Sequence, residues 1–245
     1  MTVKFYAPSY KRPEKSITQK IYPFVKLVVK ESEAQEYINN GNDIVIVPNE
    51  AQGNLCRIRN YILDHLYEDA DCVIILDDDC KGIYRWENQK KVKFEPDELL
   101  EFAEQMSILC NDFTFKFWGL NCVQDKGAYR EHTPFGTLQY IGGPFQAHLK
   151  NNIRYDIELP LKEDYDITLQ HIKKYGGCLR VNFANYDVKQ AEQAGGCAEI
   201  RNTKKEKQQF DLLQKKWGSK IIQKDNSSKR KFDFNPILKC PIKGV

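Results

Sequence analysis

The sequence predicts an α/β protein whose mostly parallel, Rossmann-like sheet is flanked by helices in a single domain. Short β-rich runs alternate with helical ones through the N-terminal half, which is typical of parallel strands joined by right-handed crossovers. A chain of 245 residues with 41% hydrophobic residues can bury one large core. No apolar run approaches the roughly 20 residues that cross a bilayer, so we expect no membrane span.

Four strands are expected in the first third of the chain, where β-branched and aromatic residues cluster. They are Val3–Pro8, Phe24–Lys30, Asp43–Pro48 and Cys72–Asp79. The segments Glu33–Asn40 and Leu55–Tyr67 lie between these strands and carry residues at helical spacing. This alternation predicts that the strands run parallel.

The rest of the chain continues with strands and helices in a less regular order. Strands are expected at Gly82–Trp86, as an edge strand, and at Lys116–Cys122 and Cys178–Ala184. The segment Thr137–Lys150 is β-rich and broken at Gly142-Gly143-Pro144. Helices are expected at Pro96–Cys110, at Glu163–Gly177 with a glycine stop, and at Lys205–Gly218.

The stretch CVIILDDDC ends an apolar strand in three aspartates, Asp77, Asp78 and Asp79. Adjacent carboxylates repel one another, and burying one without a partner is costly. Parallel sheets bind ligands beyond the carboxyl ends of their strands, where the Ser9–Pro13 loop should also emerge. Carboxylate oxygens there suit Mg²⁺ or Mn²⁺, which would neutralise the phosphates of a nucleotide. The alternative is an acidic turn that caps a helix or faces water.

A second acidic pair, Glu163 and Asp164, opens a predicted helix. A carboxylate there could activate an acceptor hydroxyl, or it could simply be stabilised by the helix dipole. Asp166 points to another side of the helix and is expected to be structural or to contact an acceptor. Gly142 and Gly143 permit close backbone approach to a ligand, and a tight turn is the alternative.

Other side chains indicate less. The eight cysteines form no CxxC pair, which argues against a zinc site and a disulfide scaffold. His148 could reach the site, but no second histidine lies at metal-ligand spacing. The start MTVKFYAPSY lacks the apolar region and cleavage site of a signal peptide, so we expect a cytoplasmic protein.

Charge is segregated along the chain although the net charge is only +3. Residues 201–245 contain thirteen Lys and Arg against four Asp and Glu, so the preceding residues are net acidic. Such asymmetry indicates either a polyanionic partner held by the C-terminal part or a solvated helix face and tail.

Four motifs in order, PSYKRP, GNLCRIRN, VIILDDDC and the Glu163-Asp164 pair, resemble a glycosyltransferase of the GT-A fold. The resemblance implies a catalytic domain at residues 1–200, with residues 201–245 as a basic helix and tail packed on it. It implies that Asp77 and Asp79 hold the metal, and that Asp164, beside Glu163, is the catalytic base. The residues it implies for donor binding are Pro8, Ser9, Arg12, Arg59, Asn60, Asp77, Asp78, Gly142, Gly143 and Arg201.

Within that fold the chain is most similar to the TET/JBP-associated glycosyltransferases, the group of base J glucosyltransferase and of phage enzymes that glycosylate hydroxymethylated pyrimidines in DNA. The resemblance implies a UDP-linked sugar donor, an inverting mechanism, Mn²⁺ or Mg²⁺ as cofactor and modified DNA as acceptor. No DNA-specific motif is present, and no histidine follows the acidic pair as a third metal ligand. The expected phosphate contacts are Lys204, Lys205, Lys207, Lys229, Arg230 and Lys231.

Three alternatives remain open. The acceptor could be a glycan, a lipid or a protein. A sugar nucleotidyltransferase would share the sheet and the metal carboxylates, but FYAPSYKRP contains no glycine-rich phosphate loop. A non-catalytic nucleic-acid-binding protein could use the basic C-terminal part, although RRM, zinc-finger and KH signatures are missing.

Overall fold

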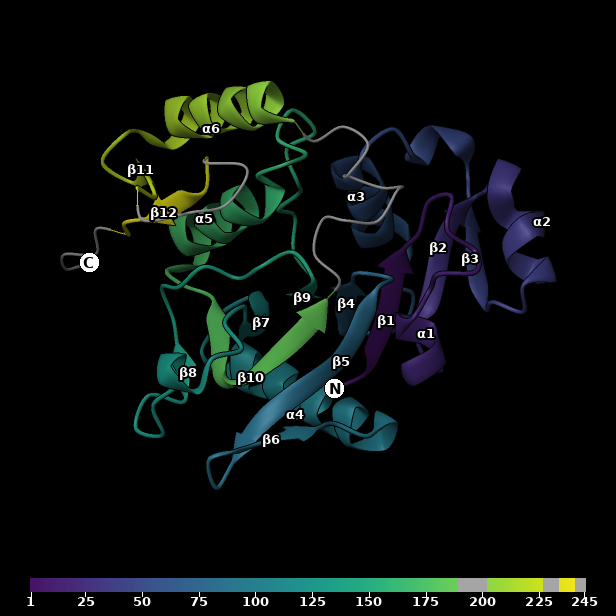
Figure 1. Cartoon of the computed structure of the whole chain (residues 1–245), viewed down its shortest axis with the longest axis horizontal. Coiled ribbons are helices and arrows are strands. Elements are labelled where there is room, and N and C mark those ends of the chain that lie inside the picture. The colour runs from purple at the N-terminus through teal and green to yellow at the C-terminus, as the bar shows by residue number, and fades with distance from the viewer. Residues whose placement is uncertain (189–201, 227–233, 241–245) are drawn as a thin grey trace.

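The computed structural model describes residues 1–188, 202–226 and 234–240, which form an α/β domain around one mixed sheet. In the described residues this sheet has ten strands, in the order β3-β2-β1-β4-β9-β7-β10-β5-β6 with β8 beside β10, and Figure 1 labels them. The strands are β1 (Val3–Pro8), β2 (Lys26–Lys30), β3 (Ile44–Val47), β4 (Cys72–Leu76), β5 (Cys80–Glu87), β6 (Lys90–Lys93), β7 (Phe117–Asn121), β8 (Phe135–Gly136), β9 (Phe145–Leu149) and β10 (Leu179–Val188).

Helices and short 3₁₀ turns connect these strands. The helices are α1 (Thr18–Ile21), α2 (Glu31–Asn39), α3 (Leu55–His65), α4 (Pro96–Asp112), α5 (Glu163–Tyr175) and α6 (Thr203–Trp217), with 3₁₀ turns η1 (Asn49–Ala51) and η2 (Lys126–Ala128). A separate two-stranded sheet pairs β11 (Ile222–Lys224) with β12 (Pro236–Leu238). The predicted α/β fold is therefore confirmed, and helix and strand bounds agree with the sequence to within a few residues.

The parallel part of the sheet lies where the sequence predicted it. β1 pairs in parallel with β2 and β4, and β2 with β3. β9 runs antiparallel to β4 and β7, because the chain returns to the carboxyl edge of the sheet at Gly142 and Gly143 before β9 begins. The carboxyl ends of β1 and β4 and the start of β9 consequently meet at one edge.

The expectation of an edge strand at Gly82–Trp86 is wrong. β5 lies between β10 and β6, and β6 forms the edge instead. Asn88 and Gln89 both have positive φ, the backbone that a two-residue hairpin turn requires, so the chain reverses directly after β5. The lysine-rich Lys90–Lys93 has little apolar pattern, which is why hydrophobic periodicity did not indicate this strand.

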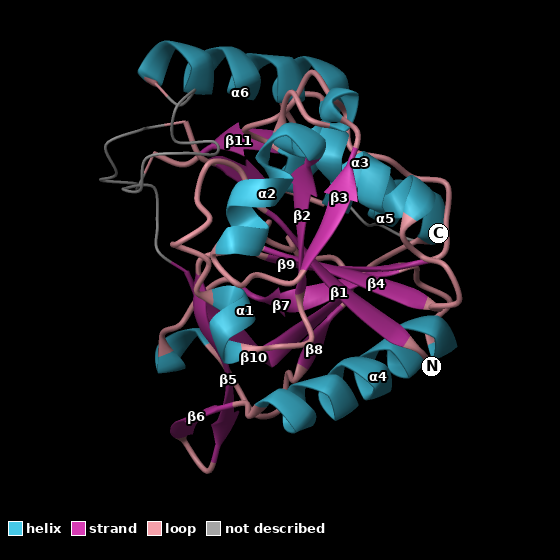
Figure 2. Ribbon diagram, turned by 90° about the vertical axis from the view of Figure 1, so that its right-hand side faces the viewer, coloured by secondary structure: helices cyan, strands magenta, loops and turns pink. Residues whose placement is uncertain are grey.

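Helices cover both faces of the sheet (Figure 2). Leu99 and Phe102 of α4 pack on one face, against core residues such as Ile74 and Trp118. Ile62 of α3 and the apolar side of α5 pack on the other face. No helix in the described part of the chain is long and apolar enough to cross a membrane.

The C-terminal helix α6 packs beside α5, as Figure 1 also shows. Phe210 and Leu213 join a cluster with Leu169 of α5. Asp166, 0% exposed, accepts a 2.8 Å hydrogen bond from Nε1 of Trp217, so its role is to dock α6. The sequence offered this structural role as one of two for Asp166.

Candidate active site

The two segments that the sequence placed together do meet. Ser9, after β1, donates a 2.5 Å hydrogen bond to Oδ2 of Asp78, after β4. Arg12 of the same loop lies with Nη2 2.6 Å from Oδ1 of Asp78. This contact follows from the register, because parallel neighbours β1 and β4 release both segments at the same edge of the sheet.

Asp78 is the carboxylate that holds this loop in place. It is 1% exposed, and its backbone carbonyl accepts a 2.9 Å hydrogen bond from the amide of Ile17. Burial raises its pKa to about 6, while Arg12 and the Ser9 hydroxyl oppose that rise. Because its carboxylate oxygens already contact Arg12 and Ser9, Asp78 holds the Ser9–Pro13 loop in place and is not directed at a ligand.

Asp77 and Asp79 are less well compensated. Asp79 has its nearest cation, Nη1 of Arg12, at 3.7 Å, and burial together with Asp77 and Asp78 raises its pKa to about 7. The Asp77 side chain is 34% exposed, with Nη2 of Arg59 at 3.4 Å from Oδ1. Desolvation raises the pKa of Asp77 as well, against the pull of Arg59 and Arg12. The strand therefore ends in more negative charge than the two arginines neutralise.

This donor set fits a divalent ion with an incomplete protein shell. Asp77 and Asp79 offer hard oxygens, whereas no group of three His, Cys, Asp or Glu in the described ranges is arranged to hold a metal. Mg²⁺ is commonly held by one or two carboxylates together with substrate phosphates and water. The residues present match that mode, in which a bound diphosphate completes the coordination.

Arg59 joins the two acidic motifs. Its guanidinium is 1% exposed and lies with Nη1 3.4 Å from Oε1 of Glu163 and Nη2 3.4 Å from Oδ1 of Asp77. Nη2 also donates a 3.0 Å hydrogen bond to the carbonyl of Gly143. Arg59 was expected near the nucleotide. Its burial instead makes it the cation that fixes the aspartate turn, the glycine pair and the start of α5 relative to one another.

A buried polar chain supports Arg59 from behind. Gln146 Oε1 accepts hydrogen bonds from Arg59 Nη1 at 3.0 Å and from the Tyr155 hydroxyl at 2.6 Å. His148 Nε2 lies 2.8 Å from the same hydroxyl. Because that hydroxyl has donated its only proton to Gln146, His148 must be the donor, which leaves Nδ1 as an unpartnered acceptor, as observed. His148 is 0% exposed, so the expectation that it could reach the site is wrong.

Glu163 and Asp164 differ in environment although they are adjacent. Burial and the neighbouring Asp164 raise the pKa of Glu163 well above its usual value, and Arg59 only partly opposes this. Asp164 is half-buried and accepts hydrogen bonds at Oδ2 from the Tyr140 hydroxyl and from the Gly143 amide, the latter at 3.4 Å. A general base has to reach the acceptor hydroxyl, so the buried Glu163, whose Oε1 faces Arg59, is the poorer candidate and the half-buried Asp164 the better one.

Close packing accounts for the first glycine of the pair. A Cβ on Gly142 would lie 2.2 Å from the Tyr186 hydroxyl, whereas one on Gly143 would make ordinary contacts at 3.5 Å with Arg59 and Glu163. Gly143 contributes through its backbone, because its amide contacts Asp164 and its carbonyl accepts from Arg59. The segment is thus part of the site.

Two other predicted donor contacts lie differently. Asn60 exchanges hydrogen bonds with the backbone of Tyr155, at 2.8 Å from Nδ2 and 2.7 Å to Oδ1, so its amide joins α3 to the segment after β9. Pro8 ends β1 directly before the loop that contacts Asp78. Arg201 lies outside the described residues.

The predicted phosphate contacts are only partly placed. Lys204 and Lys205 are exposed on α6, while Lys207 pairs with Asp211 at 2.9 Å. Lys216 of the same helix lies 2.6 Å from Asp156 and contributes to docking. Lys229, Arg230 and Lys231 lie outside the described residues.

Sequence reasoning missed Tyr140, Gln146 and Tyr155. One signal was available, because Gln146 interrupts the otherwise apolar start of Phe145–Leu149, and a polar residue at a buried position needs a partner. Tyr140 and Tyr155 lie in segments without regular structure, where no periodicity indicates which side chains turn inward.

Comparisons with known proteins agree with this geometry. The sequence matches the family described as TET-Associated Glycosyltransferase over residues 3–196. No curated protein matches it. Among solved structures, S. aureus TarS 1-349 in complex with UDP-GlcNAc aligns with a TM-score of 0.53 and 14% identity, covering 87% of this chain and 65% of that one.

Two further structures are more distant. S. aureus TarS 1-349 without that ligand gives a TM-score of 0.48 and 16% identity over 76% of this chain and 59% of that chain. A197 from STIV aligns with a TM-score of 0.42 and 13% identity, covering 77% of this chain and 86% of that chain. The chain thus spans less than two thirds of the TarS chains, and the likeness with a TM-score of 0.53 supports the GT-A fold alone. With the family matched over most of its length, the chain belongs to the TET-associated glycosyltransferases.

Proposed function

We propose that this chain transfers a sugar from a nucleotide-sugar donor, UDP-linked, to the hydroxymethyl group of a modified pyrimidine in DNA. One observation carries the proposal. Asp77 and Glu163, from acidic motifs far apart in the sequence, lie at 3.4 Å from the two terminal nitrogens of one buried arginine. A nucleotide-binding end and a base-bearing end are thereby held at fixed positions, which is what transfer between two substrates needs.

The donor end is formed by the turn after β4 and the loop after β1. Asp77 and Asp79 would hold Mn²⁺ or Mg²⁺, which supplies charge neutralisation to a diphosphate leaving group. Arg12, whose side chain is 14% exposed, remains within reach of a ligand above Asp78. The TarS structure that shares the fold was solved with UDP-GlcNAc, which supports a UDP-sugar as the first donor to test.

The acceptor end is formed by Asp164. Its carboxylate takes the proton of the acceptor hydroxyl as the new bond forms between that oxygen and the anomeric carbon of the sugar, while the bond from that carbon to the diphosphate oxygen breaks. Attack on the face opposite the leaving group inverts the anomeric configuration. Tyr140 and the Gly143 amide fix the Asp164 carboxylate in position.

The DNA acceptor is supported by membership of the family and by the excess of Lys and Arg in residues 201–245. A duplex or single strand carries phosphates that such cations can hold, whereas a small alcohol does not need them. Transfer to a glycan, a lipid or a protein is the alternative outcome. Tight DNA binding without release of nucleoside diphosphate from the donor would instead favour a non-catalytic nucleic-acid-binding protein.

The test has two steps. The protein is first incubated with a panel of nucleotide sugars and Mn²⁺, and slow release of nucleoside diphosphate identifies the donor. The same donor is then offered with DNA containing 5-hydroxymethylpyrimidine, with unmodified DNA and with a free saccharide. Transfer to the modified DNA alone is expected. Efficient transfer to the saccharide, with none to DNA, would reject the DNA acceptor and retain the glycosyltransferase.

A further inference from the structure

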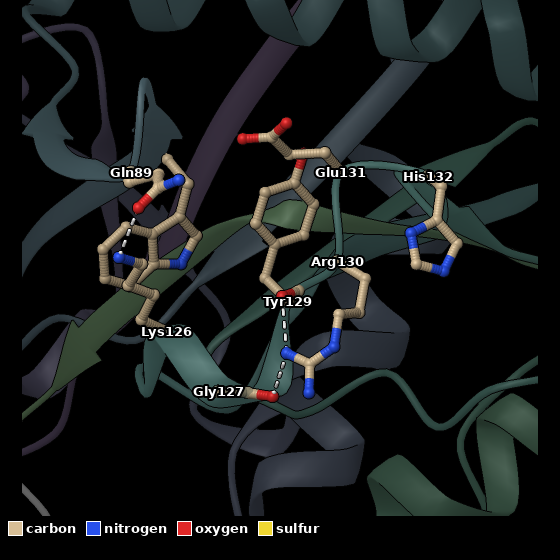
Figure 3. Close-up of a pocket in the computed structure, with 8 residues that line it drawn as sticks. Gln89, Lys126, Gly127, Tyr129, Arg130, Glu131 and His132 are labelled. Carbon is tan, nitrogen blue, oxygen red and sulfur yellow. Dashed lines mark hydrogen bonds between the residues drawn. The ribbon is translucent and has the colours of Figure 1, made fainter.

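A second concave surface lies away from the carboxylates. The cavity, of about 490 Å³, opens between the β5–β6 hairpin and the segment that follows β7. It is lined by Trp86, Gln89, Lys126, Gly127, Tyr129, Arg130, Glu131 and His132 (Figure 3). None of these residues takes part in the site described above.

The lining combines aromatic rings with cations. Trp86 and Tyr129 are half-buried, and Lys126 and Arg130 are exposed beside them. Figure 3 shows Tyr129 between Gln89 and Lys126 on one side and His132 on the other. Lys126 donates a 2.8 Å hydrogen bond to Gln89, and Arg130 binds the carbonyls of Gly127 and Tyr129 through Nη1 alone. These hydrogen bonds hold the polar side chains at the rim of the cavity in defined positions.

Positive charge exceeds negative charge around this cavity. Its lining holds the two cations Lys126 and Arg130 and one acid, Glu131. Strand β6 adds Lys91 and Lys93, which lie opposite Trp86 and Tyr84 and therefore on the same face of the hairpin. None of these four cations has a carboxylate partner within the described ranges, whereas lysines elsewhere, such as Lys162, do pair with acids. An excess of cations beside aromatic rings indicates an anionic ligand with flat faces.

The cavity lies at the far end of β5, the strand that begins directly after Asp77, Asp78 and Asp79. Side chains alternate along β5, and Ile83 enters the core while Arg85 meets Glu98 of α4 at 3.1 Å. Tyr84 and Trp86 thus face away from α4. From Asp79 to Trp86 an extended chain covers about 23 Å at roughly 3.3 Å per residue. At roughly 3.4 Å per nucleotide, that distance corresponds to about seven steps of a strand.

We infer that this cavity is a subsite for the nucleic-acid strand that flanks the acceptor nucleotide. A base stacks on Trp86 or Tyr129, and phosphates lie against Lys91, Lys93, Lys126 and Arg130. The inference rests on the proposed function, because it takes the acceptor to be DNA. A neutral glycan would use the rings but not the cations, and an inorganic polyanion would use the cations but not the rings. Their combination is typical of strand-binding grooves.

The test separates stacking from charge. Affinity for a fluorescent 12-nucleotide strand with one 5-hydroxymethylcytosine at the second position from either end is measured over a salt series, and again with abasic sites six to eight nucleotides from that cytosine. Trp86→Leu should weaken binding of the first strand roughly 5- to 100-fold, the range for one lost base–aromatic stack, and Trp86→Phe should restore most of it. The abasic strand should bind both variants as it binds the parent protein.

The charge arm uses the pair Lys126→Gln with Arg130→Gln. The slope of log affinity against log salt should fall by about 1 per removed cation. A matched control removes the exposed Lys26, on β2 near the opposite edge of the sheet, and the exposed Lys150, which follows the central strand β9, and should leave the slope nearly unchanged. An equal loss in this control, or equal affinity of the parent protein for the intact and abasic strands, would overturn the subsite.

Failure of the subsite is distinguishable from failure of the proposed function. If the parent protein glycosylates the 12-nucleotide strand but the cavity variants do so with unchanged kcat/KM, the DNA acceptor stands and the subsite is wrong. If no DNA is glycosylated, the acceptor assignment is wrong, and the binding measurements alone decide the subsite. The midpoint of thermal unfolding is measured for every variant. Only variants whose midpoint equals that of the parent protein are compared, so that misfolding is recognised.

Discussion

The carboxamide oxygen of Gln146 lies 3.0 Å from Nη1 of Arg59, and neither side chain reaches solvent. This bond sets the plane of the guanidinium, whose remaining edges face Asp77, Glu163 and the carbonyl of Gly143. A buried cation that holds two acidic motifs depends on such an orienting acceptor, because its long side chain has several rotamers of similar energy.

Replacing Gln146 by Met keeps the volume but removes the acceptor of both Arg59 and Tyr155. We expect the free energy of unfolding to fall by about 1–3 kcal/mol, since two buried donors lose their partner. We also expect kcat for sugar transfer to fall roughly 10-fold, because Arg59 no longer fixes the start of α5. Chemical unfolding and steady-state transfer assays measure the two effects.

Tyr155→Phe is the matched control for that change. It removes one hydroxyl from the same chain but leaves the bond between Gln146 and Arg59, so stability should fall while kcat stays close to that of the parent protein. If Tyr155→Phe lowers kcat as much as Gln146→Met, orientation of Arg59 is not what the chain contributes.

The ionised Asp79 should destabilise the ligand-free protein. Its pKa is raised to about 7, so the folded state holds this proton more tightly than the unfolded chain. The contribution of this proton to the free energy of unfolding is fully present below the pKa of the unfolded chain, near 4. It is lost as the pH rises through 7. Asp79→Asn removes the charge, and we expect the free energy of unfolding at pH 8 to rise by roughly 1–3 kcal/mol.

The same variant should lose the response to metal. Thermal unfolding of the parent protein with UDP and Mn²⁺ should shift upward relative to either alone, and this shift should vanish in Asp79→Asn. Asp78→Asn is the contrasting change. It weakens the partner of Arg12 and should therefore destabilise the protein. An unchanged Mn²⁺-dependent shift in Asp79→Asn would exclude that carboxylate as a ligand.

Asp164→Asn keeps the shape of the side chain and one acceptor oxygen but removes its basicity. Turnover should fall by roughly 10²-fold or more with little change in donor affinity, because general-base catalysis contributes about that factor. Tyr140→Phe removes the hydroxyl that binds Asp164 without touching the carboxylate, and should cost far less. Collapse of donor binding in Asp164→Asn, with much of the turnover retained, would make it a binding residue.

Much of the architecture could be predicted because it depends on local pattern. The spacing of Leu55–Tyr67 predicted the helix found at Leu55–His65, and the parallel-sheet rule correctly brought Ser9 beside Asp78. Adjacent residues on that helix point about 100° apart, so Arg59 enters the site while Asn60 turns to Tyr155. Which of the two does so depends on how α3 docks, and a single sequence does not encode this locally.

The features that the sequence did not predict also depend on how separate elements pack together. Gln146 matters because Arg59 and Tyr155 arrive from other elements, and the β5–β6 cavity exists because an unpredicted hairpin places Trp86 beside the segment after β7. The excess of lysine in residues 201–245 is visible in the sequence, whereas Lys126 and Arg130 lie more than 30 residues after Lys91 and Lys93 and come near them only through the fold. Contacts of this kind are set by tertiary packing.

His171 should make the protein sensitive to acid. It is 0% exposed, both ring nitrogens lack hydrogen-bond partners in the described structure, and its ring stacks on Phe117 at 4.7 Å. Burial, with a smaller contribution from Lys174, lowers its pKa to about 3. In the unfolded chain the ring takes up a proton near pH 6.5. Between pH 6.5 and 3 the unfolded state therefore binds more protons than the folded state, and the free energy of unfolding decreases as the pH is lowered.

His171→Leu removes this proton uptake at nearly constant volume. The difference in unfolding free energy between pH 7.5 and pH 5 should shrink by about 1–2 kcal/mol relative to the parent protein, because each unit of pKa difference corresponds to about 1.4 kcal/mol. Urea unfolding at the two pH values gives this difference directly. Replacement of the exposed His65 at the end of α3 is the control and should leave the difference as it is in the parent protein. Parallel stability curves for His171→Leu and the parent protein across this range would show that His171 does not set the acid limit.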